Sequence, residues 1–302
     1  MTQSDLDAVS RRMSVSVSVI IPVYRDWERL QLCLDALERQ TLPARDCEII
    51  IANNEPVADP PPLRLPANAR IVHEPRPGAY AARNTAIAQS SGRFLALTDS
   101  DCVPVPQWLE HGLSILADHP DWRVTGPVPI FREPGTSRFA YLYEFHTAFR
   151  FKEAVSLGRC GAGNLMVARE VFDRIGPFNE DLASGGDTEW GERAHRQGVP
   201  IHFDERVSVA HPSRRSLAEI IKKKRRIAGS IAQRKAYPTW RYFLYRLMPP
   251  FRHYYRSFIG FRRGPIKPLD AIVLFFVHWL GQLAEGQEFL FVRKGWKRPN
   301  RS

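Results

Sequence analysis

Apolar and polar positions follow two different periods along the first part of the chain. Residues 14–24 alternate valine with serine and then become continuously apolar, which is the pattern of a buried β-strand. Residues 26–40 place Leu30 and Leu34 four positions apart, which predicts a helix. Residues 47–54 form a short apolar run that ends in two asparagines. The chain is therefore predicted to open with a strand, a helix and a second buried strand.

The alternation of strand and helix continues along the chain. Residues 69–78 predict a short third strand and its exit, residues 79–92 a helix that stops at a glycine, and residues 93–99 a fourth strand. Later, residues 187–197 predict a short amphipathic helix and residues 199–211 predict strands. This order predicts an α/β fold whose mixed, mainly parallel sheet is flanked by helices.

Charge divides the 302-residue chain into two parts. Residues 1–213 hold 22 basic and 28 acidic side chains, a net charge of −6, whereas residues 214–302 hold 21 basic and 4 acidic ones, a net charge of +17. Residues 1–14 are polar and predict a frayed start. A basic, aromatic-rich, helical segment such as 214–302 attracts polyanions through its long-range field, so anionic lipid and nucleic acid are both candidate partners.

Cysteine usage bears on the compartment. The four cysteines, Cys33, Cys47, Cys102 and Cys160, show neither close pairing nor the spacing of a zinc site. They predict reduced thiols in an intracellular chain and no zinc finger. The N-terminal residues do not read as a secretory signal, because acidic residues and serines interrupt them.

Polar side chains follow three of the predicted strands. Tyr24, Asn53 and Asp99 each come directly after an apolar run. In open α/β sheets, ligands bind outside the carboxyl ends of the strands. These side chains are therefore expected to converge on one place.

Two aspartates one residue apart follow the fourth strand. Asp99 and Asp101 suit a hard cation, Mg²⁺ or Mn²⁺, whose remaining positions are filled by substrate phosphates. Aspartates in a loop also form turns and caps, so the pair alone does not specify a site. Arg83, on the helix after a glycine loop, adds a phosphate-binding group or a solvated helix charge.

A third polar element begins at a pair of glycines. Asp187 follows Gly185 and Gly186 at the start of a predicted helix. A carboxylate there either caps the helix or accepts a proton from a hydroxyl nucleophile. Both interpretations stay open on the sequence of this segment.

Taken in order, five segments resemble the motifs of family 2 inverting glycosyltransferases with the GT-A fold. They are SVIIPVY, EIIIANN, RPGAYAARNTAIAQSSGRFLALTDSDCVP, GAGNLMVAREVFDRIGPFNEDL and GGDTEWGERAHRQG. The resemblance spans about residues 15–213. These residues are therefore predicted to form a GT-A domain, the Rossmann-like fold of nucleotide-diphospho-sugar transferases. It implies a nucleotide-sugar donor, commonly a UDP-sugar, and a divalent cation, Mn²⁺ or Mg²⁺.

The resemblance also assigns roles to individual residues. Around the donor it places Pro22, Val23 and Tyr24 beside the base and ribose, Asn53 at the base, Arg83 near the nucleotide, and Gly163 and Asn164 of residues 161–164 along the donor sugar. It makes Asp99 and Asp101 the metal-binding pair, with Asp101 the direct ligand. It makes Asp187 the catalytic base, and His211 either a downstream metal ligand or a structural histidine.

Two positions depart from the family pattern. The family often has aspartate where Asn53 stands, so the preference for uracil is less secure. It often has Glu-Asp where this chain has Gly186-Asp187, which leaves Asp187 as the base and Glu189 as the second choice. His195 and His202 are weaker candidates than His211 for the metal.

The implied reaction is a single in-line displacement at the anomeric carbon. Asp187 removes the proton of an acceptor hydroxyl, while a cation on Asp101 neutralises the charge that grows on the departing diphosphate. The predicted enzyme moves a sugar from a nucleotide-sugar to a saccharide or lipid-linked acceptor in the synthesis of polysaccharide, glycolipid or cell-envelope glycan.

Residues 214–302 predict contact with a membrane surface. Arginines interleaved with aromatics suit the headgroup region of anionic lipid, although a helical cap packed on the catalytic domain fits the same pattern. The apolar run 271–280 is short for a membrane span, so insertion of residues 266–284 is left open. The prediction is a cytoplasmic enzyme, peripheral at the inner face of the membrane.

Two other functions fit parts of the chain. A degenerate sugar-nucleotide domain that anchors a basic tail to membrane or nucleic acid is the main alternative, but all the site residues are present. Nucleic acid is not favoured, because no RNP, zinc-finger or helix-turn-helix signature accompanies the charge. A nucleotidyltransferase lacks the glycine- and lysine-rich triphosphate loop that it needs.

Overall fold

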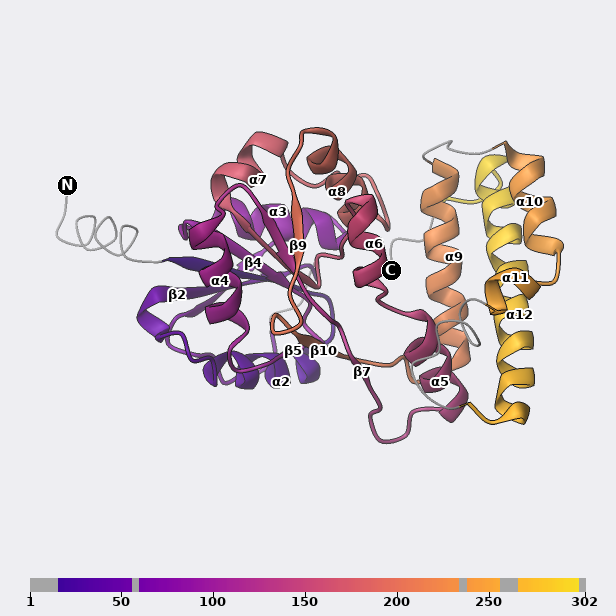
Figure 1. Cartoon of the computed structure of the whole chain (residues 1–302), viewed down its shortest axis with the longest axis horizontal. Coiled ribbons are helices and arrows are strands. Elements are labelled where there is room, and N and C mark those ends of the chain that lie inside the picture. Colours follow the sequence, from indigo (N-terminus) through magenta and orange to yellow (C-terminus); the bar gives the residue numbers. More distant parts are fainter. Residues whose placement is uncertain (1–15, 56–59, 234–237, 256–265, 299–302) are drawn as a thin grey trace. The chain divides into compact units, whose positions relative to one another are not determined.

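The computed structural model describes residues 16–55, 60–233, 238–255 and 266–298, and the segment predicted to fray, 1–14, lies outside them. The chain divides into two compact units (Figure 1). Unit 1 comprises residues 1–129, 149–180 and 186–211, and unit 2 comprises residues 130–148, 181–185 and 212–302. The last segment of unit 2 begins at residue 212, close to residue 214, where the basic part of the chain begins. Unit 2 also includes residues 130–148 and 181–185, which lie within the predicted transferase domain in sequence.

Unit 1 is built on a seven-stranded sheet of order β3-β2-β1-β4-β8-β6-β9. Its strands are β1 (Val17–Val23), β2 (Cys47–Asn53), β3 (Ala69–His73), β4 (Phe94–Thr98), β6 (Arg123–Thr125), β8 (Asn164–Ala168) and β9 (Ile201–Phe203). β1, β2, β3 and β4 are parallel, as are β6 and β9, whereas β8 runs antiparallel to both β4 and β6. The predicted mixed, mainly parallel sheet is confirmed.

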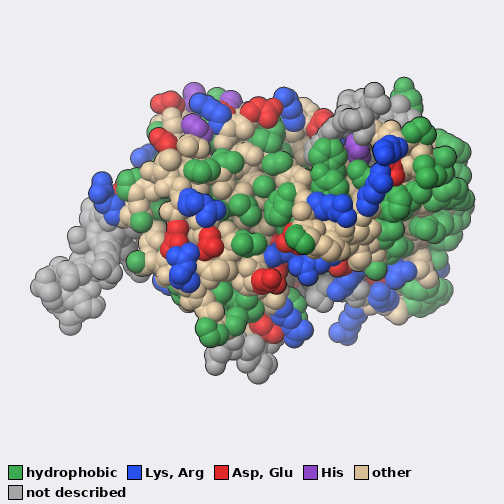
Figure 2. Space-filling model, turned by 90° about the horizontal axis from the view of Figure 1, so that it is seen from below, with side chains coloured by type: hydrophobic (Ala, Val, Ile, Leu, Met, Phe, Trp, Pro, Cys, Tyr) green, Lys and Arg blue, Asp and Glu red, His purple; other side chains and the backbone are tan. Residues whose placement is uncertain are grey.

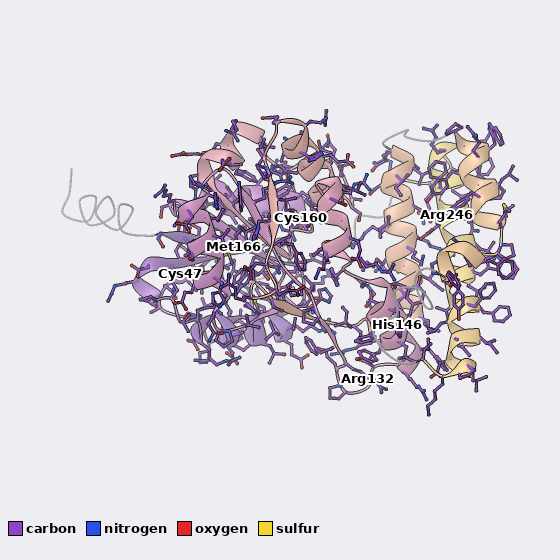
Figure 3. All side chains as sticks on the ribbon, in the orientation of Figure 1. Cys47, Arg132, His146, Cys160, Met166 and Arg246 are labelled. Carbon is purple, nitrogen blue, oxygen red and sulfur yellow. The ribbon has the colours of Figure 1, made fainter. Side chains whose placement is uncertain are left out.

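Helices flank this sheet (Figure 1). They are α2 (Trp27–Glu38), α3 (Ala79–Ala88), α4 (Trp108–Asp118), α6 (Phe151–Ala154), α7 (Arg169–Ile175) and α8 (Gly186–Arg196), with the 3₁₀ turns η1 (Ala44–Asp46) and η2 (Val155–Leu157). Two short strands, β5 (Val103–Pro104) and β10 (Val209–Pro212), pair antiparallel beside the sheet. Ile20, Ile50 and Leu97 are completely buried in their strands, because helices cover both faces of a sheet of this class. Met166 and Cys160 belong to the same interior (Figure 3).

Unit 2 is mainly helical, as the sequence predicts for the basic C-terminal region. It contains β7 (Ile130–Phe131), α5 (Arg138–Thr147), α9 (Leu217–Gln233), α10 (Thr239–Leu247), α11 (Phe251–Tyr254) and α12 (Pro268–Arg293). Proline at the first position of α12 suits a helix start, since its missing N–H has no partner there in any case. Ala140, Tyr143, Ile220, Leu274 and Val277 form one apolar cluster of this unit, from α5, α9 and α12. Of the described helices, α12 alone is long and apolar enough to cross a membrane, and half of its most apolar stretch is buried within the structure.

Candidate active site

The parallel strands of unit 1 end at a common edge, as their order along the chain predicts. Val23, the last residue of β1, is the register partner of Asn53, the last residue of β2. β4 runs parallel to β1 on its other side and ends at Thr98, directly before Asp99. The segments that follow the three strands therefore start side by side.

Asp99 is held by an arginine from α3. The carboxylate of Asp99 forms an ion pair with the guanidinium of Arg83, whose side chain is almost completely buried. Gly163 lies against the same carboxylate, because a β-carbon at this position would be 2.9 Å from Asp99 Oδ2. In this structure Arg83 thus positions Asp99 and is not a solvated helix charge, and its place near the nucleotide stays a prediction.

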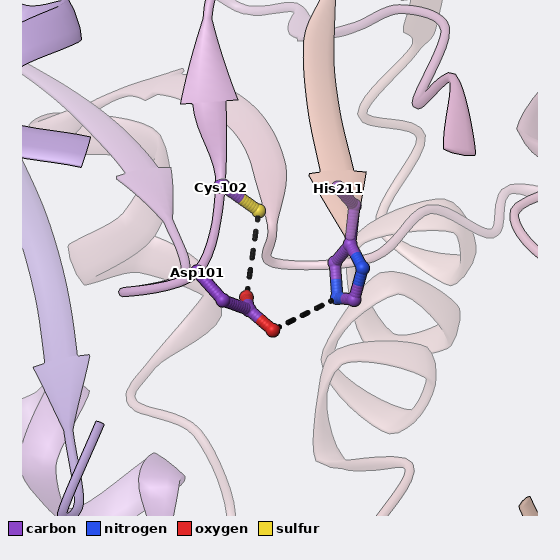
Figure 4. Close-up of side chains that lie close together, drawn as sticks. All are labelled: Asp101, Cys102 and His211. Carbon is purple, nitrogen blue, oxygen red and sulfur yellow. Dashed lines mark hydrogen bonds and ion pairs between the residues drawn. The ribbon is translucent and has the colours of Figure 1, made fainter. Parts of the chain in front are cut away.

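Asp101 faces a histidine from β10. The distance between His211 Nε2 and Asp101 Oδ2 is 3.4 Å, and Cys102 Sγ is 3.9 Å from Asp101 Oδ1 (Figure 4). The three side chains are close enough to one another to hold one ion. Phe149 packs its ring 4.8 Å from the ring of His211.

The donor atoms of this cluster suit a hard divalent cation. A carboxylate oxygen and an imidazole nitrogen are ligands that Mn²⁺ accepts, and Mg²⁺ binds through one or two carboxylates together with phosphates. Cys102 does not extend this set, because a thiol is a soft ligand that suits zinc, copper or iron–sulfur sites better than Mg²⁺ or Mn²⁺. Asp101 and His211 are therefore the residues that fit a cation.

Asp187 is the second residue of helix α8 and lies beside Tyr80. The Tyr80 hydroxyl donates a hydrogen bond to Asp187 Oδ1 at 3.2 Å, and the Ala162 N–H reaches Oδ2 at 3.4 Å. The Thr188 N–H also bonds Oδ1, at 2.9 Å, so the carboxylate is fixed from two sides. Burial is the main cause of the raised pKa of the Tyr80 hydroxyl, and the nearby Asp187 carboxylate adds to it, so this hydroxyl stays a donor.

The glycine before Asp187 has a steric reason. A β-carbon at Gly186 would lie 2.7 Å from the ring of Tyr80. The ring thus occupies the space that a glutamate side chain, common at this position in the family pattern, would need to cross. The chain therefore has glycine at 186, where the family often has glutamate, because the ring of Tyr80 fills the adjacent space.

One turn of α3 connects the two carboxylates. Tyr80 and Arg83 are three residues apart, so both lie on one face of the helix, and one bonds Asp187 while the other bonds Asp99. The segment 161–163 repeats this bridge, since its Ala162 N–H reaches Asp187 and Gly163 lies against Asp99. Asp187 and the Asp99–Asp101 pair, 88 and 86 residues apart in sequence, meet at one site in unit 1.

The loop that leads into α3 is clamped by a residue that the sequence analysis did not single out. Asn54 Nδ2 donates to the carbonyls of Glu74 and Arg76, and Asn54 Oδ1 accepts from the Gly78 N–H, all at 2.7–2.8 Å. Gly78 adopts a positive φ of 135°, which glycine tolerates. These three hydrogen bonds of Asn54 fix the backbone just before α3, and so they help to position Tyr80 in the first turn of that helix.

The residues that the resemblance places around the base and ribose of the nucleotide differ in how exposed they are. Tyr24 is exposed, whereas Val23 is buried in β1 and Pro22 is partly buried. Asn53 is buried too, and its Oδ1 accepts a hydrogen bond from the Glu55 N–H at 2.9 Å. Arg25, directly after Tyr24, has a positive φ of 59°, which is unusual for a residue with a side chain and marks a constrained turn at this edge.

Asn164 differs from its expected role beside the donor sugar. Its side chain is completely buried, with Oδ1 accepting from Trp108 Nε1 at 3.0 Å and Nδ2 donating to the Val207 carbonyl at 2.8 Å. Both ends of the amide are therefore used inside the protein, where they join β8 to its neighbours. Asn164 therefore supports the interior of unit 1 through these two hydrogen bonds.

The second-choice residues lie in other environments. Glu189 forms an ion pair with Arg193 at 2.8 Å, one turn along α8. His195 packs against Gly158, and His202 stacks on Trp122 at 5.4 Å. Of these three histidines, His211 is the one that faces Asp101.

Tyr80 and Asn54 are the site residues that sequence reasoning missed. The signal for Tyr80 was available, since it stands three residues before Arg83 in a predicted helix and so shares its face. Asn54 had a weaker signal, because an asparagine after a strand is also a common turn residue.

Comparison with known proteins adds independent findings. Residues 18–176 match the family model described as Glycosyl transferase family 2. The glycosyltransferase AglE of Haloferax volcanii is 32% identical over 285 residues, which are 89% of this chain and 93% of that protein. The succinoglycan biosynthesis protein ExoM of Rhizobium meliloti is 26% identical over 226 residues, 70% of this chain and 72% of that protein.

Solved structures share the fold. TarS 1–349 of S. aureus, in complex with UDP-GlcNAc, aligns with a TM-score of 0.52 at 14% identity, over 93% of this chain and 91% of that one. The mannosyltransferase PcManGT of Pyrobaculum calidifontis, in complex with GDP-Man and Mn²⁺, aligns with a TM-score of 0.50 at 17% identity, over 92% and 73%. The fold is thus the predicted GT-A fold, and the chain belongs to glycosyl transferase family 2 and is a glycosyltransferase.

Proposed function

We propose that the protein transfers a sugar from a nucleotide-sugar to an acceptor hydroxyl with inversion at the anomeric carbon, and that Asp187 is the catalytic base. The observation that carries this proposal is the pair of contacts from one turn of α3, Tyr80 to Asp187 and Arg83 to Asp99. It supports a site in which a catalytic base and the metal-binding pair Asp99 and Asp101 face one substrate.

Asp187 has the surroundings of a positioned base. Three donors bind its two oxygens, which restricts the carboxylate to one orientation. The side chain is only partly buried, so a hydroxyl nucleophile has access to it. A carboxylate in this position accepts the proton of the acceptor hydroxyl as that oxygen attacks the anomeric carbon, and no covalent intermediate is needed.

Asp101 and His211 would hold Mn²⁺ or Mg²⁺. A cation bound there supplies positive charge to the diphosphate of the donor and to the leaving group. Arg83 keeps Asp99 beside this position, and the glycine at 163 leaves room for the Asp99 carboxylate. The structure of PcManGT, which shares the fold, contains Mn²⁺ together with GDP-Man.

The relatives support a choice of donor and acceptor classes to test. UDP-sugars are the first class to test and GDP-mannose the second, because related structures hold UDP-GlcNAc and GDP-Man. A saccharide or lipid-linked acceptor in cell-envelope glycan or polysaccharide synthesis suits a relative of a succinoglycan biosynthesis protein. A cytoplasmic location is part of the proposal, and the four free, buried cysteines support it.

Titration calorimetry with UDP-GlcNAc and GDP-mannose, each with Mn²⁺, tests the proposal. One donor is expected to bind the wild-type chain, and Asp101→Ala should weaken that binding at least roughly tenfold because it removes a metal ligand. Asp118→Ala removes an exposed carboxylate from the end of α4 and should leave binding unchanged. Asp187→Asn should bind the donor normally but not turn it over.

Two results would contradict this proposal. The first is donor binding by Asp101→Ala that equals that of the wild type. The second is a folded protein that binds RNA strongly and none of the nucleotide-sugars, which would favour the degenerate binding module.

A further inference from the structure

Helix α12 buries polar side chains and exposes apolar ones. Its buried residues include Asp270, His278, Gln282, Glu285 and Glu288. Its outward residues Leu269, Ile272, Phe276 and Leu280 are 52–71% exposed. A helix on the surface of a soluble domain has the opposite arrangement. The outer face of α12 is therefore suited to an apolar environment.

The apolar face continues over the neighbouring helices. The exposed large hydrophobic residues of α10, α11 and the positions next to them are Trp240, Leu244, Tyr245, Leu247, Met248, Phe251 and Tyr255. Trp279 of α12 donates a hydrogen bond to the Leu247 carbonyl, so α10 and α12 lie side by side within unit 2. Figure 2 shows hydrophobic side chains gathered over these helices. These residues and the four on α12 are called the apolar surface below.

Ion pairs hold the interior of unit 2 together. Glu285 of α12 pairs with Lys224 of α9 and with Arg246 of α10, both at 2.8 Å (Figure 3 labels Arg246). Glycine at position 281 leaves room for the Lys224 side chain, because a β-carbon on residue 281 would lie 2.6 Å from Lys224 Cδ. The charges of α12 are thus satisfied inward, which leaves its apolar residues to face outward.

The charges that remain outside are positive. Within the described residues 238–255 and 266–298, the three carboxylates, Asp270, Glu285 and Glu288, are all buried. Exposed cations stand at both ends of the apolar surface, Arg241 at the start of α10, Lys267 before α12, and Lys294 and Arg298 after it. Trp240, Tyr245 and Trp296 are exposed near these ends, and such side chains favour the boundary between lipid and water.

We propose that the apolar surface is embedded in one leaflet of an anionic lipid bilayer. Apolar residues enter the acyl chains, aromatic residues with polar tips lie at the headgroups, and the flanking cations contact lipid phosphates. This inference does not depend on the proposed transfer reaction. It assigns a lipid surface to unit 2 and leaves the donor chemistry to unit 1.

The neighbour of α12 argues against a complete crossing. α9 packs along α12 from Ile220, beside Leu274, to Ala228, beside Phe289. The basic run at residues 222–226 lies between these two contacts, and Lys222 is exposed. A crossing by α12 would carry this run into the hydrocarbon region, where charged side chains are costly.

A second copy of the chain is a poorer occupant than lipid. A two-fold interface brings the same patch of both subunits together. The apolar surface would then set one group of exposed cations against another, with no exposed carboxylate in the described residues 238–255 and 266–298 to balance them. Anionic lipid balances the same cations.

Vesicle flotation of the full-length chain tests the proposal. The double variant Phe276→Glu/Leu280→Glu should reduce the vesicle-bound fraction at least roughly tenfold, since two apolar side chains that would enter the acyl region are replaced by charged ones. The matched control is Leu32→Glu/Leu65→Glu, which makes the same change at two exposed leucines of unit 1. The control should float like the wild type, and both variants should keep their nucleotide binding and circular dichroism.

Several outcomes would overturn the proposal. They are failure of the wild type to float, equal flotation of the wild type and Phe276→Glu/Leu280→Glu, or equal loss in the control. Sedimentation that shows a dimer split by Phe276→Glu/Leu280→Glu, without vesicle binding, would assign the surface to a second copy. Loss of nucleotide binding alone would contradict the proposed function and leave this inference standing.

The cations make a separate contribution. Lys267→Gln/Lys294→Gln should weaken binding to vesicles of phosphatidylcholine mixed with phosphatidylglycerol by roughly fivefold per lysine. Binding to pure phosphatidylcholine should not change. Arg45→Gln/Arg196→Gln, at two exposed arginines of unit 1, serves as the charge-matched control. Equal weakening on both kinds of vesicle would contradict the role of anionic headgroups.

Discussion

The two units of this chain place their polar groups in opposite ways. Unit 1 buries continuous apolar strands and directs carboxylates to the edge where the strands end. Unit 2 buries carboxylates between helices and exposes its large apolar side chains. Of the described large hydrophobic residues that are exposed, Tyr24, Leu32, Leu65 and Leu157 belong to unit 1 and the other twelve to unit 2. Burial of polar groups thus distinguishes the unit to which we assign the chemistry from the unit to which we assign lipid contact.

The largest expected effect concerns Asp187, the proposed base in unit 1. Asp187→Asn keeps the size of the side chain but cannot accept the proton, so turnover should fall roughly 10²- to 10⁴-fold with donor affinity unchanged. The measurement is steady-state transfer together with calorimetric donor binding. Glu189→Gln is the matched control, because Glu189 pairs with Arg193 and should keep most of the activity. A larger loss in Glu189→Gln than in Asp187→Asn would reverse the assignment.

The next effect concerns the interior of unit 2. Glu285→Ala leaves Lys224 and Arg246 without their shared partner, and removing one member of a buried ion pair costs about 3–5 kcal/mol. Chemical unfolding in mild detergent, followed by circular dichroism, measures the loss. Lys222→Ala, at an exposed position of α9, should change the free energy of unfolding by less than about 0.5 kcal/mol. Equal stability of the two variants would show that the interior charges do not hold unit 2 together.

A smaller effect isolates the contact between Tyr80 and Asp187. Tyr80→Phe removes one hydrogen bond to a carboxylate, which should lower kcat about tenfold with donor affinity unchanged. Tyr245→Phe removes an exposed hydroxyl in unit 2 and should have no effect on kcat. Gly186→Ala should reproduce the Tyr80→Phe loss, since its β-carbon displaces the same ring. Full activity in both site variants would remove Tyr80 from the site.

The smallest effect is a pH dependence in unit 1. The Arg76 side chain, followed by Thr85, lowers the pKa of Glu74 from its ordinary value of 4.5 to about 2. Because the folded pKa is depressed, this carboxylate stabilises the fold above pH 4.5, and that stability is lost as the pH falls toward 2. Glu74→Gln should therefore flatten the acid limb of stability against pH. Glu28→Gln, at an exposed position of α2, should leave the acid limb unchanged, and the same limb in wild type and Glu74→Gln would contradict this cause.

Sequence reasoning predicted most of unit 1 because its elements carry local signals. The apolar runs at 17–23, 47–53 and 94–98 became parallel strands, and the helix after the glycine loop became α3. The site was harder to predict in detail. The hydrogen bond from Tyr80 to Asp187 joins residues 107 positions apart, so no local pattern contains it. The pairing of Arg83 with Asp99 likewise depends on the packing of α3 against the sheet.

Unit 2 shows a different limit of sequence reasoning. Composition located a basic, aromatic-rich helical region, and α9 to α12 are there. It did not show which face of α12 is buried, because charged and apolar residues both recur along this helix. Residues 130–148 also group with this unit, and no local pattern indicates it, since α5 joins through tertiary contacts such as the hydrogen bond between Tyr143 and His278 at 2.9 Å.

One cross test addresses the central claim that the two units separate chemistry from lipid contact. Vesicle flotation and Mn²⁺-dependent binding of UDP or GDP are measured on the same preparations of wild type, Asp101→Ala and Phe276→Glu/Leu280→Glu. Asp101→Ala is predicted to float but not to bind nucleotide, and Phe276→Glu/Leu280→Glu to bind nucleotide but not to float. Loss of both properties in either folded variant would contradict the separation.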